Sequence, residues 1–136
     1  SDPKAMIGSD GLPFDAHPHP RLWGTFPRGL GHYGRDLGLF SLEEAVRRMT
    51  SLSALQFDLV DRGTLAAGAF ADITVFDPAT VRDTASFEDP IRPAAGIAHV
   101  FVNGRQVWGD GAVTGNRPGR ALRHQTRAAK RKSVFS

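Results

Sequence analysis

The 136-residue sequence has no cysteine. That absence excludes disulfide bonds, thiolate zinc sites and cysteine nucleophiles. The sequence also has no apolar run near the roughly 20 residues that a membrane-spanning helix needs. Its first residues, SDPKAMIGSDG, hold one lysine and an apolar run of only four residues, which is too short for a signal peptide. We therefore expect a cytoplasmic protein with no membrane partner.

Acidic residues are absent from the last 20 positions. Residues 117–136 hold seven Lys/Arg and no Asp/Glu, whereas residues 1–116 hold ten Lys/Arg and fourteen Asp/Glu. The formal net charge of +3 therefore comes from a basic tail, and such a tail attracts phosphate groups in a salt-dependent way. Proteins that bind single strands also stack bases on aromatic side chains, but Phe135 stands beyond this charge cluster. We expect a flexible, solvated tail and no nucleic-acid partner.

The first 40 residues predict a strand followed by a long loop. An apolar run over residues 5–8 that stops at Ser9-Asp10-Gly11 is typical of a buried parallel strand that ends in a tight turn. Residues 12–38 are dense in glycine, proline and histidine and show no lasting periodicity. A stretch of this kind is usually a functional loop or disordered, and its aromatic side chains favour an ordered loop.

Two helices are predicted next. Ser41 with Glu44 three residues later is a capping-box pattern, and apolar side chains follow it at helical spacing. The exposed face of this helix is expected to carry three charged residues, Glu43, Arg47 and Arg48. Residues 54–57 then predict a second, short helical turn.

The periodicity changes from helical to twofold at Gly63. β-rich runs follow at residues 63–65, 72–76, 98–102 and 105–108. Asn103-Gly104 joins the last two runs and is a strong signal for a type I′ hairpin. We predict that residues 72–76 and 98–108 pair in one antiparallel sheet.

Two charged residues near the N-terminus are candidates for chemistry. Asp10 follows an apolar strand, and catalytic groups gather at the carboxyl ends of strands in a parallel barrel. An Asp in a Ser-Asp-Gly turn has an equally simple structural role. Arg21 is able to hold a carboxylate through two parallel hydrogen bonds, or to be a solvated loop arginine. The residue types alone leave both alternatives open.

The histidines give a weaker signal. His17-Pro-His19-Pro has the spacing of a His-x-His metal motif. Each histidine precedes a proline, however, and the resulting polyproline II geometry turns the two rings apart. We therefore favour a loop scaffold or a pocket wall over a metal pair. His32 and Tyr33 line a site or fill the loop's own core, and the sequence does not separate the two.

Two segments carry a resemblance to a known family. The first comprises Met6-Ile7-Gly8-Ser9-Asp10-Gly11-Leu12-Pro13 and Asp15-Ala16-His17-Pro18-His19-Pro20-Arg21-Leu22-Trp23-Gly24-Thr25-Phe26-Pro27-Arg28. It strongly resembles the N-acyl-D-amino-acid deacylases, or D-aminoacylases, of the amidohydrolase superfamily. The second resembles the C-terminal β segment of many amidohydrolases and comprises Gly63-Thr64-Leu65, Ala71-Asp72-Ile73-Thr74-Val75-Phe76-Asp77-Pro78 and Val100-Phe101-Val102-Asn103-Gly104.

The resemblance implies an α/β fold joined to a β unit. Residues 1–62 would be the final strand, active-site loop and closing helices of a metal-dependent (β/α)8 barrel. Residues 63–116 would be the C-terminal share of a small composite β-sandwich, and residues 117–136 a basic tail with no counterpart in the family pattern. The implied activity is zinc-dependent hydrolysis of N-acyl-D-amino acids to a carboxylate and a free D-amino acid.

The resemblance also implies roles for the two charged candidates. Asp10 matches the aspartate that makes a weak or bridging contact with the metal and takes a proton from metal-bound water as general base. Arg21 matches the arginine that grips the α-carboxylate of the substrate.

Other family features are missing from this sequence. The early His-x-His, the cysteine or acidic metal ligand and the histidines of the middle strands have no match. We therefore expect the isolated chain to be inactive, with the N-terminal remainder of the enzyme as its partner. The alternative is a non-catalytic, β-rich interaction module that docks through an apolar sheet face.

Overall fold

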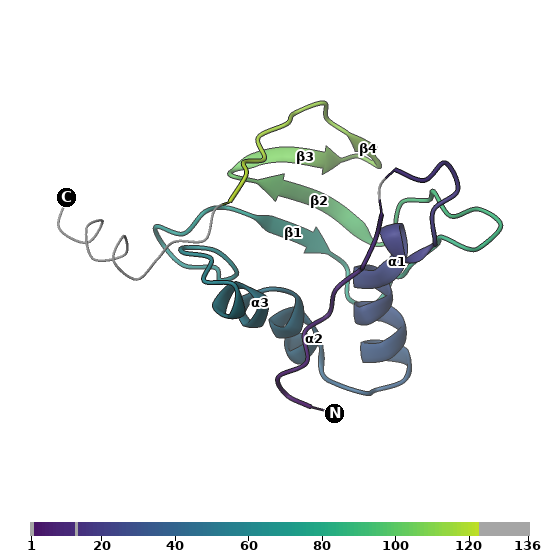
Figure 1. Ribbon diagram of the computed structural model, residues 1–136, viewed down its shortest axis with the longest axis horizontal. Helices are drawn as coiled ribbons and strands as arrows, with labels where there is room; N and C mark the ends of the chain where they lie inside the picture. The colour runs from purple at the N-terminus through teal and green to yellow at the C-terminus, as the bar shows by residue number, and fades with distance from the viewer. Residues whose placement is uncertain (1, 13, 123–136) are drawn as a thin grey trace.

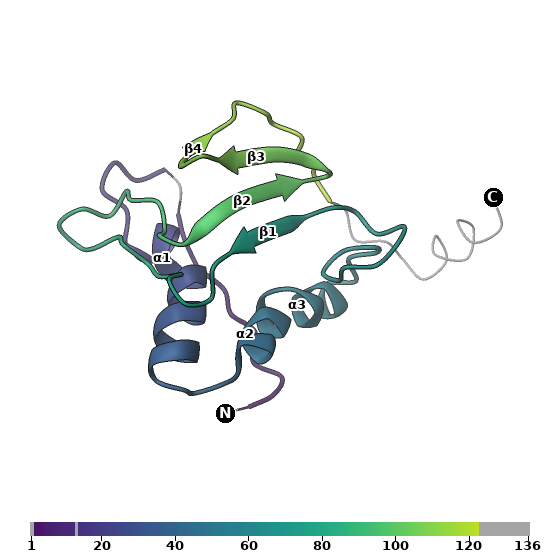
Figure 2. The same cartoon turned by 180° about the vertical axis from the view of Figure 1, so that it is seen from behind.

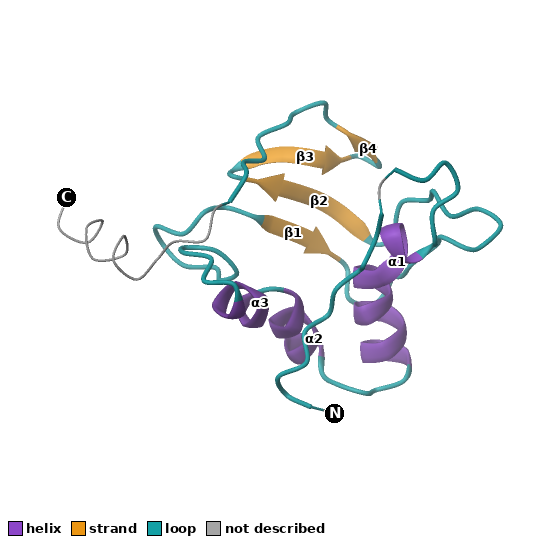
Figure 3. Ribbon diagram, viewed as in Figure 1, coloured by secondary structure: helices purple, strands orange, loops and turns teal. Residues whose placement is uncertain are grey.

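The computed structural model describes residues 2–12 and 14–122. A four-stranded antiparallel sheet, in the order β1-β2-β3-β4, has a group of helices beside its β1 edge (Figure 1). The strands are β1 (Ile73–Phe76), β2 (Ile97–Val102), β3 (Arg105–Gly109) and β4 (Ala112–Val113). The helical part, drawn in purple in Figure 3, comprises α1 (Arg21–Arg28), the π-helical η1 (Gly29–Asp36), α2 (Leu42–Met49) and α3 (Ser51–Gln56).

The predicted sheet is confirmed. β1 pairs with β2 in a register that places Val75 opposite His99, and β2 pairs with β3. Asn103 and Gly104, which turn the chain between β2 and β3, have φ angles of 48° and 77°. Two successive left-handed residues are what a type I′ turn requires, so the hairpin forms as the sequence predicts.

The prediction of a strand at residues 63–65 is wrong. These residues lie in the loop between α3 and β1. Gly63 has a φ of 79°, outside the β region, and its main chain packs so closely on Ala54 that an added Cβ would lie 2.7 Å from the Ala54 side chain. The segment therefore bends around the end of α3 and cannot extend along a neighbouring strand.

Helix α2 begins at the predicted cap. The Glu44 amide donates to the Ser41 hydroxyl oxygen at 3.2 Å. The Glu44 carboxylate accepts hydrogen bonds from Arg47 and Arg48, which together hold its pKa at about 2. The prediction that Arg48 lies on an exposed face is wrong, because this residue is only 5% exposed. Its guanidinium is satisfied by Glu44 and stacks over the Phe40 ring at 5.4 Å, which makes the burial of a charge tolerable.

The prediction of an irregular loop over residues 12–38 is also wrong in its second half. α1 runs directly into η1. The hydrogen bonds of a π-helix join residues five positions apart, as the bond from Leu37 N–H to the His32 carbonyl oxygen does at 2.9 Å. The change of helix type follows Pro27, which has no N–H to donate. Glycines in this segment allow close helix packing: a Cβ at Gly31 would lie 2.3 Å from the Val81 carbonyl oxygen.

Residues 5–8, which were predicted as a strand from their apolar pattern, form no strand within the described part of this chain. They run past α2, where the Ile7 amide donates to the Arg48 carbonyl at 3.4 Å and Arg47 donates to the Pro3 carbonyl at 2.6 Å. A strand needs hydrogen-bonding neighbours on a sheet edge, and the sheet of this chain lies elsewhere (Figure 1). The apolar pattern was therefore not sufficient to make a strand here.

The core lies where the helices meet the segment that follows β1. Its buried members are Leu30, Ala45 and Val81, against which Phe40, Val46, Met49, Phe76 and Ile97 pack. Val81 is fully buried, and its carbonyl accepts a hydrogen bond from Arg35 at 2.9 Å. Because this core draws on one end of the sheet only, much of the sheet surface is left outside it.

The remaining segments add little regular structure. No helix within residues 2–12 and 14–122 is long and apolar enough to cross a membrane. Residues 117–122 of the basic tail form neither helix nor strand. The rest of the tail lies outside the described residues, so its predicted flexibility stays a prediction.

The Gly31 contact predicts a specific loss of stability. Gly31→Ala should lower the free energy of unfolding by about 2 kcal/mol, because the new methyl group forces the main chain at Val81 to move. Gly119→Ala is the matched control, since nothing lies within 4 Å of an added Cβ there. Chemical denaturation of the purified variants measures both. Equal stabilities would mean that the η1 contact is not required for the fold.

Candidate active site

The two charged candidates form an ion pair. Arg21 Nη2 lies 2.8 Å from Asp10 Oδ2, and the two side chains are 42% and 83% exposed. The sequence separates them by eleven positions, so this contact comes from tertiary structure and not from one helix or turn. The structure therefore brings the predicted base and the predicted carboxylate-binding residue together.

Local geometry fixes the position of Asp10. Its φ of 47° is left-handed, a conformation that aspartate adopts more readily than most residues. The next residue, Gly11, packs against the first turn of α1, where an added Cβ would lie 2.6 Å from Leu22 Cδ1. The Gly11 amide also donates to the Ser9 hydroxyl at 3.3 Å. The turn predicted at Ser9-Asp10-Gly11 is not formed, because these residues have neither a hydrogen-bonded turn nor a bend. The left-handed backbone at Asp10 and the packing of Gly11 on Leu22 are what direct the carboxylate toward α1.

Arg21 is the first residue of α1, and the preceding His-Pro segment sets its direction. Its backbone N–H donates to His19 Nδ1 at 3.0 Å, which satisfies one of the free amides at the helix start. The His19 imidazole therefore accepts a hydrogen bond from a free amide of the helix start, as a capping side chain would, while Pro20 occupies the N-cap position. This hydrogen bond holds the backbone at the start of the helix, from which the Arg21 side chain contacts Asp10.

His17 and His19 both have partners in loop 83–93. His17 Nε2 lies 2.9 Å from the Phe87 carbonyl oxygen, and the His19 ring packs edge-on against the Phe87 ring at 5.0 Å. These contacts join residues 14–20 to the loop 83–93, and the two segments lie side by side in both views (Figures 1 and 2). The interpretation of this segment as a loop scaffold is supported. A pairing across about 70 positions has no local sequence signal, and for that reason the sequence did not indicate the partner.

A second ion pair supports the same region. Arg28, at the other end of α1, lies 3.0 Å from Asp83 Oδ2, and hydrogen bonds to Tyr33 and Asp83 raise the pKa of Arg28. The Tyr33 ring also packs against the His32 ring at 5.0 Å. These contacts place His32 and Tyr33 with structural neighbours on the α1–η1 helix, and they show that loop 83–93 is tied to the end of α1 through Asp83.

The described residues do not form a metal site by themselves. Among residues 2–12 and 14–122, no group of three or more His, Cys, Asp or Glu side chains is arranged to hold a metal ion. Asp10 offers one exposed carboxylate, and His17 and His19 are occupied by Phe87 and the Arg21 amide. A zinc ion usually takes three or four protein ligands, so the part of the chain that the structure describes does not fit one by itself.

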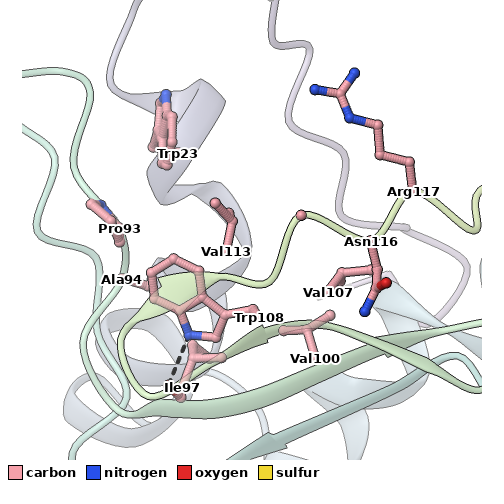
Figure 4. A pocket seen from close by; sticks show the side chains of 11 residues that line it. Trp23, Pro93, Ala94, Ile97, Val100, Val107, Trp108, Val113, Asn116 and Arg117 are labelled. Atoms are coloured by element: carbon pink, nitrogen blue, oxygen red, sulfur yellow. Dashed lines mark hydrogen bonds between the residues drawn. The ribbon is translucent and has the colours of Figure 1, made fainter.

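An apolar hollow of about 480 Å³ lies between α1 and the sheet. Trp23 of α1 and Trp108 of β3 both border it, and the Trp108 indole N–H donates to the Ile97 carbonyl at 3.4 Å (Figure 4). Neither Asp10 nor Arg21 lines this hollow. Large apolar side chains are also exposed in the segments around residues 10–21 and in loop 83–93, with Leu12 at 62%, Phe14 at 94% and Phe87 at 68%. The hollow and the ion pair are thus separate features.

Comparisons with known proteins give close matches. D-aminoacylase from Alcaligenes xylosoxydans xylosoxydans is 66% identical over 117 residues, which cover 86% of this chain and 24% of that protein. N-acyl-D-aspartate deacylase from the same organism is 54% identical over 123 residues, covering 90% and 24%. The chain therefore spans about a quarter of the length of the curated relatives it matches.

A solved structure supports the same relationship. The crystal structure of N-acyl-D-glutamate deacylase from Bordetella bronchiseptica, complexed with zinc and a phosphonate inhibitor, matches with a TM-score of 0.83 and 52% sequence identity. The match covers 90% of this chain and 26% of that one. A model of the amidohydrolase family also matches residues 2–108, which is more than half of the sequence. The chain belongs to the amidohydrolase family.

Proposed function

We propose that this chain is the C-terminal part of a zinc-dependent hydrolase that cleaves N-acyl-D-amino acids to a carboxylate and a free D-amino acid. The single observation that carries this proposal is the contact between Asp10 and Arg21. The relatives support the substrate class, because they are a D-aminoacylase and deacylases of N-acyl-D-aspartate and N-acyl-D-glutamate.

The geometry of the ion pair suits the geometry of the substrate. In an N-acyl amino acid, the α-carboxylate and the amide nitrogen are bonded to the same carbon atom. A group that moves protons at the amide and a group that holds the carboxylate must therefore be close neighbours. Asp10 and Arg21 meet this requirement, since their charged atoms are in contact at 2.8 Å.

Each residue has a role that its chemistry allows. The Asp10 carboxylate accepts a proton from the attacking water as the new C–O bond forms at the acyl carbon. It then delivers that proton to the amide nitrogen as the C–N bond breaks, which yields the carboxylate and the free amine. The Arg21 guanidinium holds the α-carboxylate of the substrate and so positions the amide beside Asp10.

Zinc would be held mainly by residues outside this chain. Asp10 is the one described side chain that we assign to the edge of such a site, as a weak or bridging ligand. The support comes from the relative that was solved with zinc. Bound zinc would polarise the acyl carbonyl and make the attacking water more acidic.

We also propose the barrel that the sequence suggested. Residues 4–10 would be its last strand, and they would gain a sheet partner only from the remainder of the enzyme. α2 and α3 would close the barrel, and the β sheet would be completed by strands from the N-terminal part. The exposed apolar side chains and the hollow at Trp23 and Trp108 support this arrangement, because surfaces of this kind are usually covered by another part of the molecule.

The base assignment predicts the effect of one substitution in the full-length enzyme. Asp10→Asn should reduce kcat at least about 100-fold, because the amide cannot accept the proton of the attacking water. The zinc content and the melting temperature should change little. Asp15→Asn, an exposed aspartate five positions away, is the matched control and should retain activity. Turnover near the wild-type value in the Asp10 variant would remove this residue from the mechanism.

The carboxylate assignment predicts a dependence on the substrate. Arg21→Lys should lower kcat/KM for free-acid substrates by about 10- to 100-fold, because an ammonium group cannot reproduce a bidentate guanidinium contact. Amide-capped substrates should be affected least. Arg28→Lys, on the same helix, should not discriminate between them. Equal losses for both substrate types in the Arg21 variant would indicate a structural arginine.

The isolated chain provides a third test, which also addresses the interaction-module alternative. Residues 1–136 alone should hydrolyse no N-acyl-D-amino acid, bind less than one zinc ion per chain and self-associate through exposed apolar surface. Co-expression with the N-terminal portion should restore some activity. A soluble monomer with a cooperative melt, unaffected by that portion, would favour the module.

A further inference from the structure

We infer that His19 and Phe87 are positioning residues for Arg21, so that loop 83–93 helps to set how the enzyme holds the α-carboxylate of its substrate. This inference rests on the proposed function, in which Arg21 binds that carboxylate. The effect passes through three linked parts of the chain: the loop, the imidazole of His19 and the backbone at the start of α1. Neither positioning residue needs to touch the substrate.

The loop that carries Phe87 holds its own shape by hydrogen bonds at its base and at its tip. At the base, the Thr84 hydroxyl donates to the Pro93 carbonyl at 2.6 Å. At the tip, the Ser86 amide donates to the Asp89 carbonyl at 3.1 Å, and the Asp89 amide donates to the Ser86 hydroxyl oxygen at 3.1 Å. Phe87 lies inside this closed tip, so its position is set by the loop itself.

Phe87 joins the loop to the His-Pro segment before α1 through both its backbone and its ring. His17 Nε2 lies 2.9 Å from the Phe87 carbonyl oxygen. The Phe87 ring meets the His19 ring edge-on, with ring centroids 5.0 Å apart and an angle of 76° between the ring planes. Edge-to-face contact is one of the favourable arrangements of two aromatic rings. With its backbone held by His17, the Phe87 ring therefore restricts the rotation of the His19 imidazole.

The orientation of the His19 ring matters because one ring atom binds the backbone of Arg21. Nδ1 of His19 accepts a hydrogen bond from the Arg21 N–H at 3.0 Å. A rotation of the imidazole about its Cβ–Cγ bond would move this acceptor away from the amide. Pro20, at the N-cap position, makes no side-chain hydrogen bond to the helix start. The His19 ring is therefore a direct restraint on the backbone from which the Arg21 side chain extends.

A carboxylate bound by a guanidinium through two parallel hydrogen bonds is sensitive to small displacements of the arginine. Loss of either ring contact should therefore weaken the recognition of the substrate by Arg21. Contacts that served stability alone would lower the melting temperature, but their effect on kinetics would not depend on Arg21. This difference separates a positioning role from a structural one.

The experiment measures kcat/KM of the full-length enzyme with N-acetyl-D-methionine. His19→Phe keeps an aromatic ring beside Phe87 but removes the acceptor, and it should lower kcat/KM about three- to tenfold, the range for one lost hydrogen bond. His19→Asn should stay within about twofold of the wild type. The asparagine Oδ1, like Nδ1 of histidine, is bonded to Cγ, and it readily accepts from the amide two residues later.

Substitutions of Phe87 test the contribution of the loop. Phe87→Ala should lower kcat/KM about two- to fivefold, in proportion to the loss of an aromatic pair, and Phe87→Tyr should retain the wild-type value. In the His19→Asn background, Phe87→Ala should cause no further loss, because no imidazole is left to orient. Glu88→Ala, at the next position of the same loop, is the matched control and should retain activity.

A double-mutant cycle with Arg21→Met decides the role. In that background, His19→Phe and Phe87→Ala should leave kcat/KM unchanged, because no guanidinium remains to be positioned. Circular dichroism and melting temperatures verify that each variant is folded, and Phe87→Ala carries the test if His19→Phe is not. Equal losses with and without Arg21 would overturn the inference. Failure of the proposed function would look different, because the wild-type enzyme would then not hydrolyse N-acetyl-D-methionine at all.

Discussion

The close approach of η1 to Val81 is the constraint on which the rest of the structure depends. The main chain at Gly31 lies so near the Val81 carbonyl that no side chain fits between them, and Arg35 donates a hydrogen bond to the same oxygen at 2.9 Å. Val81 is also the fully buried centre of a small core. Since the chain enters the loop 83–93 immediately after this point, one contact sets both the helix and the loop.

The position of the candidate site depends on the contact between η1 and Val81, although neither Asp10 nor Arg21 takes part in it. The α1 helix is continuous with η1, so fixing η1 on Val81 also fixes the direction of α1 and the position of Arg21 at its start. The loop 83–93 leaves Val81 and returns to α1 through Asp83 and Arg28, and to the preceding segment through Phe87 and His17. The charged pair is exposed, but its backbone is held by buried packing and by contacts between distant segments. The buried core therefore fixes the backbone positions of these two exposed side chains.

Local rules predicted the parts of this fold that local chemistry determines. The type I′ turn at Asn103-Gly104 and the cap at Ser41 depend on a few adjacent residues, and both form as expected. The helix over residues 21–36 was missed, because its glycines and Pro27 were treated as helix breakers, whereas Gly31 permits the contact with Val81. The strand at residues 5–8 was predicted from an apolar pattern, but strand formation also needs a partner edge, which the described residues do not offer it.

The structural and the catalytic interpretation of Asp10 are compatible with each other. From the sequence, Asp10 was either a turn residue or a catalytic one. Among residues 2–12 and 14–122, five non-glycine residues have positive φ, and all are Asp or Asn, so the conformation alone is an ordinary property of these residue types. What distinguishes Asp10 is its partner, an arginine on a helix that begins eleven positions later. The left-handed backbone at Asp10 directs the carboxylate, and the start of α1 places Arg21 within contact of it. An aspartate in this conformation is thus well suited to be a base, because its backbone fixes the direction of a short side chain.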